Sequence, residues 1–140
     1  MSHQNLKYRK FVIYLRAVGL RLTPQRVALA HLLFAHGFRH LTAESLYAEA
    51  QRARITVSLA TVYNTLRRYT DAGLLRYVPV DAARSYFDTN VAPHPHFYDQ
   101  KSGMLIDIPP ESFTILNMPT PPKNTEIDDI TIVLRIKPAV

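Results

Sequence analysis

The sequence predicts an α+β fold in which a mainly helical region, residues 1–90, precedes a smaller region, residues 91–140. Capped segments with the hydrophobic period of a helix fill the chain up to Gly73, and the period changes to that of strands beyond it. Charge is divided in a similar way, because residues 1–84 hold 13 Lys and Arg against 4 Asp and Glu, whereas residues 85–140 hold 4 against 7. The first region is therefore suited to an anionic partner.

The composition is that of a folded protein, with 140 residues of which 47% are hydrophobic and 20% are charged. No apolar run reaches the length of a membrane helix and the N-terminus lacks the plan of a signal peptide, so we expect a cytoplasmic protein without a membrane partner. The sequence contains no cysteine, which excludes disulfides, thiolate nucleophiles and Cys-ligated zinc. Any bound metal must be held by His, carboxylate or similar ligands.

The first two helices are indicated by apolar spacing and by their end signals. One is expected over Tyr8–Val18, where apolar residues recur among basic ones and Gly19 follows. Thr23 is placed to cap the next helix with Pro24 at its first position, and this helix is expected to end before Gly37. The residues expected to face the core are Phe11, Val12, Leu15, Val18, Val27, Ala30, Leu33 and Phe34.

Two further helices follow, and the last of them carries the most informative pattern. Thr42 is expected to cap a helix over Ala43–Arg52, and Ser58 a helix that ends at Gly73. This last helix pairs an apolar stripe with a polar face suited to the major groove of DNA, where Asn and Arg read base edges. A solvated surface helix has the same appearance, so the helix alone leaves both interpretations open. The stripe is Leu59, Val62, Leu66 and Tyr69, and the polar face is Ala60, Thr61, Tyr63, Asn64, Arg67 and Arg68.

A β-hairpin is predicted after the fourth helix, with strands over Leu74–Val80 and Arg84–Asp88. Helices followed by a short basic hairpin are the plan of a winged helix-turn-helix domain, in which Arg76 and Arg84 are placed to lie along the DNA backbone. The charge division, the polar helix face and this wing together favour a domain that binds double-stranded DNA.

The region after Pro93 is expected to hold three strands, at Phe97–Tyr98, Met104–Ile108 and Ile130–Lys137. Pro109–Asn124 is rich in proline and is expected to form a short helix or irregular structure. A region of about fifty residues with few strands would expose apolar sheet edges, so we expect it to pair with a second copy as a homodimer.

A metal site is indicated by His94 and His96, which lie on the same face of an extended chain because one residue separates them. Asp88 at the end of the wing and His40 before the third helix are the other candidate ligands, and together the four suit Zn, Mn or Fe. His94 and His96 could instead ligate haem iron. The same histidines could hold a hydrolytic zinc, but no separate base or nucleophile stands out, so we do not expect an enzyme.

Five motifs occur in a fixed order: Gly19–Arg26, His40–Tyr47, Leu59–Tyr63, Asp71–Gly73 and His94–His96. With them the chain resembles the ferric uptake regulator (Fur) family over nearly its whole length. Residues 58–64 and 86–91, together with Phe97-Tyr98 and the cysteine-free C-terminal half, resemble the iron response regulator (Irr) branch of that family.

The resemblance implies a winged-helix domain, a small α/β dimerisation domain, and a homodimeric transcriptional regulator of iron and haem genes that binds operator DNA. It implies that Tyr63 contacts bases, that Arg26 contacts phosphate and that Arg16 approaches the minor groove. Thr61, Asn64, Arg67 and Arg76 complete the expected DNA-binding set. In the family the hinge metal site corresponds to His40, Asp88, His94 and His96.

The chain also departs from the family. A structural Cys₄ zinc is impossible, and Pro93 and Pro95 stand where relatives often have ligands of a second metal site. Irr relatives commonly carry three consecutive histidines, whereas Pro95 interrupts the run here. The leading hypothesis is an Irr-type regulator whose DNA affinity depends on metal or haem at the domain junction. The alternatives are a repressor that senses Mn, Fe or Zn directly, a small metal-dependent hydrolase, and a winged helix that binds only protein.

Overall fold

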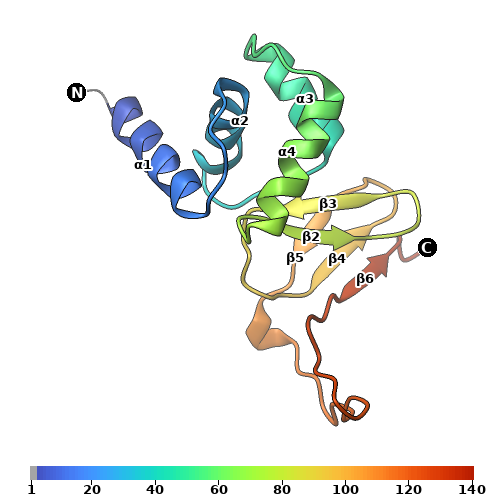
Figure 1. The fold of residues 1–140 in the computed structure, drawn as a ribbon. Helices are drawn as coiled ribbons and strands as arrows, with labels where there is room; N and C mark the ends of the chain where they lie inside the picture. Colours follow the sequence, from blue (N-terminus) through green and yellow to red (C-terminus); the bar gives the residue numbers. More distant parts are fainter. Residues whose placement is uncertain (1–2) are drawn as a thin grey trace. The chain divides into compact units, whose positions relative to one another are not determined.

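The computed structural model of this chain describes residues 3–140, with the side chains of all of these except residues 3–8 and Phe11. It contains two compact units, which are described separately (Figure 1). Unit 1 comprises residues up to Val78 with Arg84–Val91, and unit 2 comprises Pro79–Ala83 with Ala92–Val140. Within the described part of the chain, none of the helices combines the length and apolarity needed to span a lipid bilayer.

Unit 1 begins with four helices, α1 (His3–Ala17), α2 (Pro24–Phe34), α3 (Ala43–Arg52) and α4 (Leu59–Asp71). The predicted caps of the last three are confirmed, because each capping side chain accepts a backbone N–H from the first turn. The predicted start of α1 at Tyr8 is wrong, since the helix begins five residues earlier. Residues 3–7 are mainly polar and show no apolar period that would indicate a helix, but they contain no Gly or Pro that would stop one.

The helices enclose the core of unit 1, and most of the predicted stripes are confirmed. Leu15, Val62, Leu66 and Tyr69 are buried, as are Val27, Ala30 and Leu33. Leu59 was expected in the α4 stripe but is only partly buried, and it is the first residue of the helix. Thr65 is buried in its place. The predicted core position Phe11 lies outside the described side chains, whereas Phe34 packs on Tyr69 with ring centroids 6.3 Å apart.

Tyr69 is fully buried, and its hydroxyl donates to the backbone carbonyl of Arg26 at 2.5 Å. Burial raises the pKa of this phenol well above its ordinary value of 10.0. The folded state therefore keeps the proton at a pH where the unfolded chain loses it, so stability is present below pH 10 and is lost as pH rises further. Above pH 10, we expect ionisation of Tyr69 to lower the unfolding free energy by about 1.4 kcal/mol for each further pH unit. Urea unfolding between pH 9 and pH 11 measures it, and Tyr69→Phe should show a shallower decline than the wild type; equal slopes would contradict the assignment.

A small sheet completes unit 1, with strands β1 (His40–Leu41), β2 (Arg76–Pro79) and β3 (Ser85–Asp88) in the order β1-β3-β2. The hairpin of β2 and β3 confirms the predicted wing, although β2 is shorter than expected. Leu74 is not in the strand because its N–H bonds the carbonyl of Tyr69 and closes the end of α4. The two-residue strand β1 was not predicted, since so short a segment has no periodicity.

Unit 2 is built on strands β4 (His96–Asp99), β5 (Leu105–Asp107) and β6 (Val133–Ile136) in the order β5-β4-β6. The three predicted strand regions are confirmed; β5 pairs antiparallel with β4 and β6 pairs parallel. The expectation of an α/β domain is wrong for residues 92–140, where the helical structure described is one 3₁₀ turn at Pro110–Ser112. The prolines of this region explain the difference, because each lacks the N–H that a helix interior requires.

Residues 109–132 make a long excursion between β5 and β6, drawn in orange to red in Figure 1. Most of its side chains are exposed, including large apolar ones. Exposed apolar side chains in this number are unusual for a lone domain and are typical of an interaction surface. Those of the excursion and of β6 are Ile115, Leu116, Met118, Ile127, Ile130, Leu134 and Ile136.

Candidate functional site

The first pair of candidate ligands lies on the sheet of unit 1. The antiparallel register places His40 of β1 directly opposite Asp88 of β3, and the Nε2 and Oδ2 atoms are 3.2 Å apart. Opposite residues on antiparallel strands project to the same face, which brings these two side chains together. The Asp88 side chain is only 1% exposed, and its Oδ1 also accepts the N–H of Asn90 at 2.8 Å. A carboxylate this deeply buried requires a proton donor or a cation beside it.

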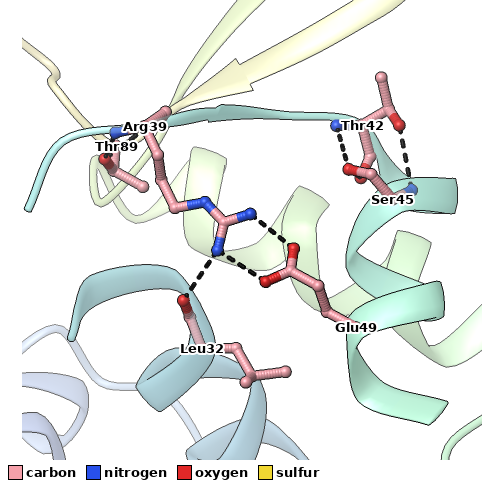
Figure 2. A network of polar contacts seen from close by, with 6 residues as sticks. All are labelled: Leu32, Arg39, Thr42, Ser45, Glu49 and Thr89. Atoms are coloured by element: carbon pink, nitrogen blue, oxygen red, sulfur yellow. Dashed lines mark hydrogen bonds and ion pairs between the residues drawn. The ribbon is translucent and has the colours of Figure 1, made fainter. Parts of the chain in front are cut away.

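A polar network holds the strands that carry this pair (Figure 2). Arg39, next to His40, donates its backbone N–H to the Oγ1 of Thr89, next to Asp88, at 2.9 Å. The guanidinium of Arg39 makes a bidentate pair with Glu49 of α3, at 2.9 and 2.5 Å, and also donates to the carbonyl of Leu32. The network thus ties β1 to β3, α2 and α3, and limits how far the two ligands can separate.

Replacing Glu49 with alanine is expected to lower the unfolding free energy by about 1–2 kcal/mol, because it leaves the guanidinium of Arg39 without its bidentate partner. Both side chains are about three-quarters buried, so the loss should exceed that of a surface ion pair. Urea unfolding measures the change. Arg52→Ala, an exposed charge on the same helix, is the control; a Glu49→Ala effect no larger than that of the control would contradict the expectation.

The second group of candidate ligands lies in unit 2. His96 of β4 pairs with Asp107 of β5 in the strand register, and its Nε2 lies 3.2 Å from Asp107 Oδ1. The Nε2 of His94 lies 2.9 Å from the same oxygen, and the two imidazole centroids are 4.4 Å apart. Two imidazoles therefore converge on one carboxylate oxygen.

The hydrogen bonding of His94 also indicates that His94, His96 and Asp107 suit a bound cation. The Nδ1 of His94 lies 2.6 Å from the carbonyl oxygen of Ala92, which fixes a proton on Nδ1 because a carbonyl only accepts. In the neutral ring, Nε2 then presents a lone pair to the oxygen of Asp107. Two acceptors at that distance repel unless a proton or a metal ion lies between them. The ligand atoms of His94, His96 and Asp107 lie within 4.8 Å of one another, and this nitrogen and oxygen donor set suits Zn, Mn or Fe.

Asp107 was not among the predicted ligands. It lies within the expected strand Met104–Ile108, one residue before its end, where a carboxylate looks like an ordinary surface residue. The pairing register of β4 and β5 places Asp107 beside His96 and identifies it as a candidate ligand, but this register cannot be read from residue spacing alone. The predicted ligands are thus brought together in two groups, His40 with Asp88 in unit 1 and His94 with His96 in unit 2. The four-residue centre remains a prediction.

The polar face of α4 is presented as predicted. Tyr63, Asn64 and Arg67 are exposed, while Thr61 is partly exposed with its Oγ1 2.9 Å from the Oγ of Ser58. The hydroxyl of Tyr63 donates to Glu44 of α3. This hydrogen bond raises the pKa of Tyr63, with smaller contributions from burial and from the charge of Glu44.

The remaining candidate DNA contacts come from other elements of unit 1. Arg16 is exposed in the last turn of α1, and Arg76 is partly exposed on β2. Arg26, in the first turn of α2, donates from Nη1 to the carbonyl of Arg21 at 2.6 Å, so its guanidinium is held against the preceding loop.

Comparison with known proteins places these features in a family. The sequence model of the ferric uptake regulator family matches residues 17–134. The chain belongs to this family. A curated relative, the peroxide-responsive repressor PerR of Staphylococcus epidermidis, is 35% identical over 94 residues, which are 66% of this chain and 61% of that protein. The chain thus spans about three-fifths of the length of the curated relative it matches.

Solved structures share the fold. The ferric uptake regulator from Pseudomonas aeruginosa with manganese has a TM-score of 0.68 at 24% identity, covering 91% of this chain and 96% of its own. The Campylobacter jejuni peroxide stress regulator has a TM-score of 0.58 at 18% identity, covering 100% and 98%. Membership of the Fur family is confirmed, whereas its Irr branch is not, since the curated relative is named for peroxide.

Proposed function

We propose that this Fur-family chain is a metal-responsive transcriptional regulator that binds operator DNA through α4 and the wing. The observation that carries the proposal is that α4 has two different faces. One face buries Val62, Leu66 and Tyr69, and the other exposes polar side chains. That face supplies the side chains that read base edges in the major groove, and the wing adds Arg76 for the phosphate backbone. We assign residues 1–90 to DNA binding and residues 91–140 to pairing and sensing.

The proposal is tested by DNA affinity measured against salt. Tyr63→Ala is expected to abolish sequence-specific binding while leaving the oligomeric state unchanged, because its side chain is exposed on the polar face of α4. Arg67→Ala should weaken binding and reduce the slope of log affinity against log salt by about one if it meets phosphate. Lys101→Ala, an exposed cation of unit 2, is the charge-matched control. Binding that Tyr63→Ala and Arg67→Ala leave intact would rule out α4 as the reading helix.

We further propose that a divalent ion is bound by His40, Asp88, His94 and His96, with Asp107 as an added ligand. Two observations support this proposal. In each group an imidazole nitrogen lies close to a carboxylate oxygen, and both atoms are metal ligands. Only five residues separate Asp88 from His94 in the chain. The ion would add positive charge beside these carboxylates. Binding changes DNA affinity only if the DNA-competent arrangement of the domains holds the ion more tightly than other arrangements do.

Haem is the second candidate ligand, held by His94 and His96 as in the Irr interpretation. The geometry favours a small cation instead, because both Nε2 atoms lie at 2.9 and 3.2 Å from Asp107 Oδ1, and haem iron could reach them only if the Asp107 side chain moved away. Titrating the protein with Mn²⁺, Zn²⁺ and haem separates the candidates. Haem that binds without displacement by Mn²⁺, and that alone changes DNA affinity, would favour the Irr alternative.

Peroxide is a candidate signal because the curated relative is named for it. The test compares DNA affinity before and after peroxide treatment of protein loaded with Fe²⁺ and with Zn²⁺, since zinc has no redox chemistry. We propose that the protein is a homodimer, that it is not an enzyme and that it acts in the cytoplasm. Exposed apolar side chains of unit 2, such as Leu134 and Ile136 of β6, support the pairing, and sedimentation of the purified protein measures it.

A further inference from the structure

The polar face of α4 contains a pair of residues from two helices. Tyr63 belongs to the N-terminal half of α4, and Glu44 to the first turn of α3, which lies beside it in Figure 1. The hydroxyl of Tyr63 donates its hydrogen to Oε1 of Glu44, which lies 19 positions earlier in the sequence. Both side chains remain exposed, so the pair lies at the surface that the proposed function assigns to DNA.

A phenol has one proton to donate and two lone pairs to accept with. Because an ionised carboxylate only accepts, the hydrogen of Tyr63 is committed to Glu44. A phenol is neutral at ordinary pH, and the same hydrogen bond raises the pKa of Tyr63 further above that range. Because the side chain is exposed, the lone pairs that remain can accept a hydrogen bond from a donor on DNA.

We propose that Glu44 determines base specificity by turning Tyr63 into a hydrogen-bond acceptor that selects an exocyclic amino group in the major groove. Adenine N6 and cytosine N4 are the amino donors exposed there, whereas guanine and thymine present acceptors at the corresponding positions. This inference rests on the proposed DNA-binding function.

The composition of the α4 face explains why such an acceptor matters. Arg67 carries only donors and therefore suits guanine, and Asn64 carries both kinds of group. Glu44 itself brings negative charge towards phosphates, which weakens affinity for every DNA sequence. The Glu44–Tyr63 pair therefore lowers affinity for DNA of any sequence, but it adds an acceptor that increases selectivity between bases.

The experiment uses the full chain loaded with Mn²⁺ and a duplex selected by it from a random-sequence library. In that duplex each adenine is replaced in turn by purine, and each cytosine by 2-pyrimidinone, so that one amino group is removed at a time. Affinity is measured for the wild type, Glu44→Ala, Tyr63→Phe and the double variant. The ratio between intact and amino-deleted duplexes cancels the general gain in affinity from removing a negative charge.

We expect one position per half-site at which loss of the amino group weakens the wild type about fivefold, the size of one hydrogen bond. Glu44→Ala, Tyr63→Phe and the double variant should each show a ratio near one there, because the pair acts as a unit. Tyr63→Phe that keeps the wild-type ratio would overturn the proposal, since Glu44 would then be reading the base itself. Glu44→Ala that keeps it would also overturn the proposal. A library that yields no enriched duplex would instead refute the proposed DNA-binding function.

Discussion

Replacing His94 and His96 together with alanine is expected to lower the affinity for Mn²⁺ and Zn²⁺ by more than about 100-fold, beyond the cost of losing an outer-shell partner. The change removes both imidazoles that converge on Asp107 and leaves Asp107 as the remaining member of the ligand group in unit 2. We also expect the metal to lose its effect on DNA affinity. Calorimetric titration of the purified protein measures the first effect, and operator affinity with and without metal measures the second.

The matched control is His36→Ala, because His36 is an exposed histidine that neither group of ligands includes. It should bind metal as the wild type does. His40→Ala and Asp107→Ala extend the test to one member of each group, and each should weaken binding less than the double variant. Wild-type titration curves from the His94, His96 double variant would show that the metal is held elsewhere.

Leu66→Ala is expected to lower the unfolding free energy of the protein by about 3 kcal/mol, within the 2–5 kcal/mol typical of such core truncations. Leu66 is fully buried on the inward face of α4, where the helix packs against the core of unit 1. The substitution deletes apolar contact and leaves a cavity that the neighbouring helices fill only in part. Urea unfolding followed by circular dichroism measures the loss.

Asn64→Ala is the control for this experiment, because Asn64 lies two residues away on the exposed face of the same helix. Its effect on stability should stay within about 0.5 kcal/mol, as for most surface substitutions. For DNA affinity the order should be reversed: Asn64→Ala should lose more affinity than Leu66→Ala, because Asn64 is a candidate DNA contact. A loss below about 1 kcal/mol for Leu66→Ala would show that α4 is not held by this stripe.

The helices of unit 1 could be predicted because their signals are local. Thr23, Thr42 and Ser58 each cap the helix that follows, and each needs only the next three residues to do so. The buried stripe of α4 was predicted for the same reason, apart from Leu59 at the end of the helix. Exposure of Tyr63 followed from this stripe, whereas its contact with Glu44 depends on how α3 and α4 pack.

The ligand groups were predicted only in part because they depend on strand register. His94 and His96 were found from their own spacing, but Asp107 enters through pairing between β4 and β5. The pairing of His40 with Asp88 likewise depends on β1, whose two residues carry no pattern. Strand pairing between distant segments is set by tertiary packing, and the sequence limits it only weakly.

The parallel pairing of β4 with β6 has a consequence for the order of events during synthesis. The N–H of His96 donates to the carbonyl of Ile132, so His96 is placed beside a strand that is synthesised some forty residues later. While the nascent chain is still on the ribosome, β4 has no such neighbour, and domains fold as units once their chain has emerged. We therefore expect metal capture to follow translation of β6, so that ribosome-bound chains lacking residues 133–136 neither retain the ion nor respond to it.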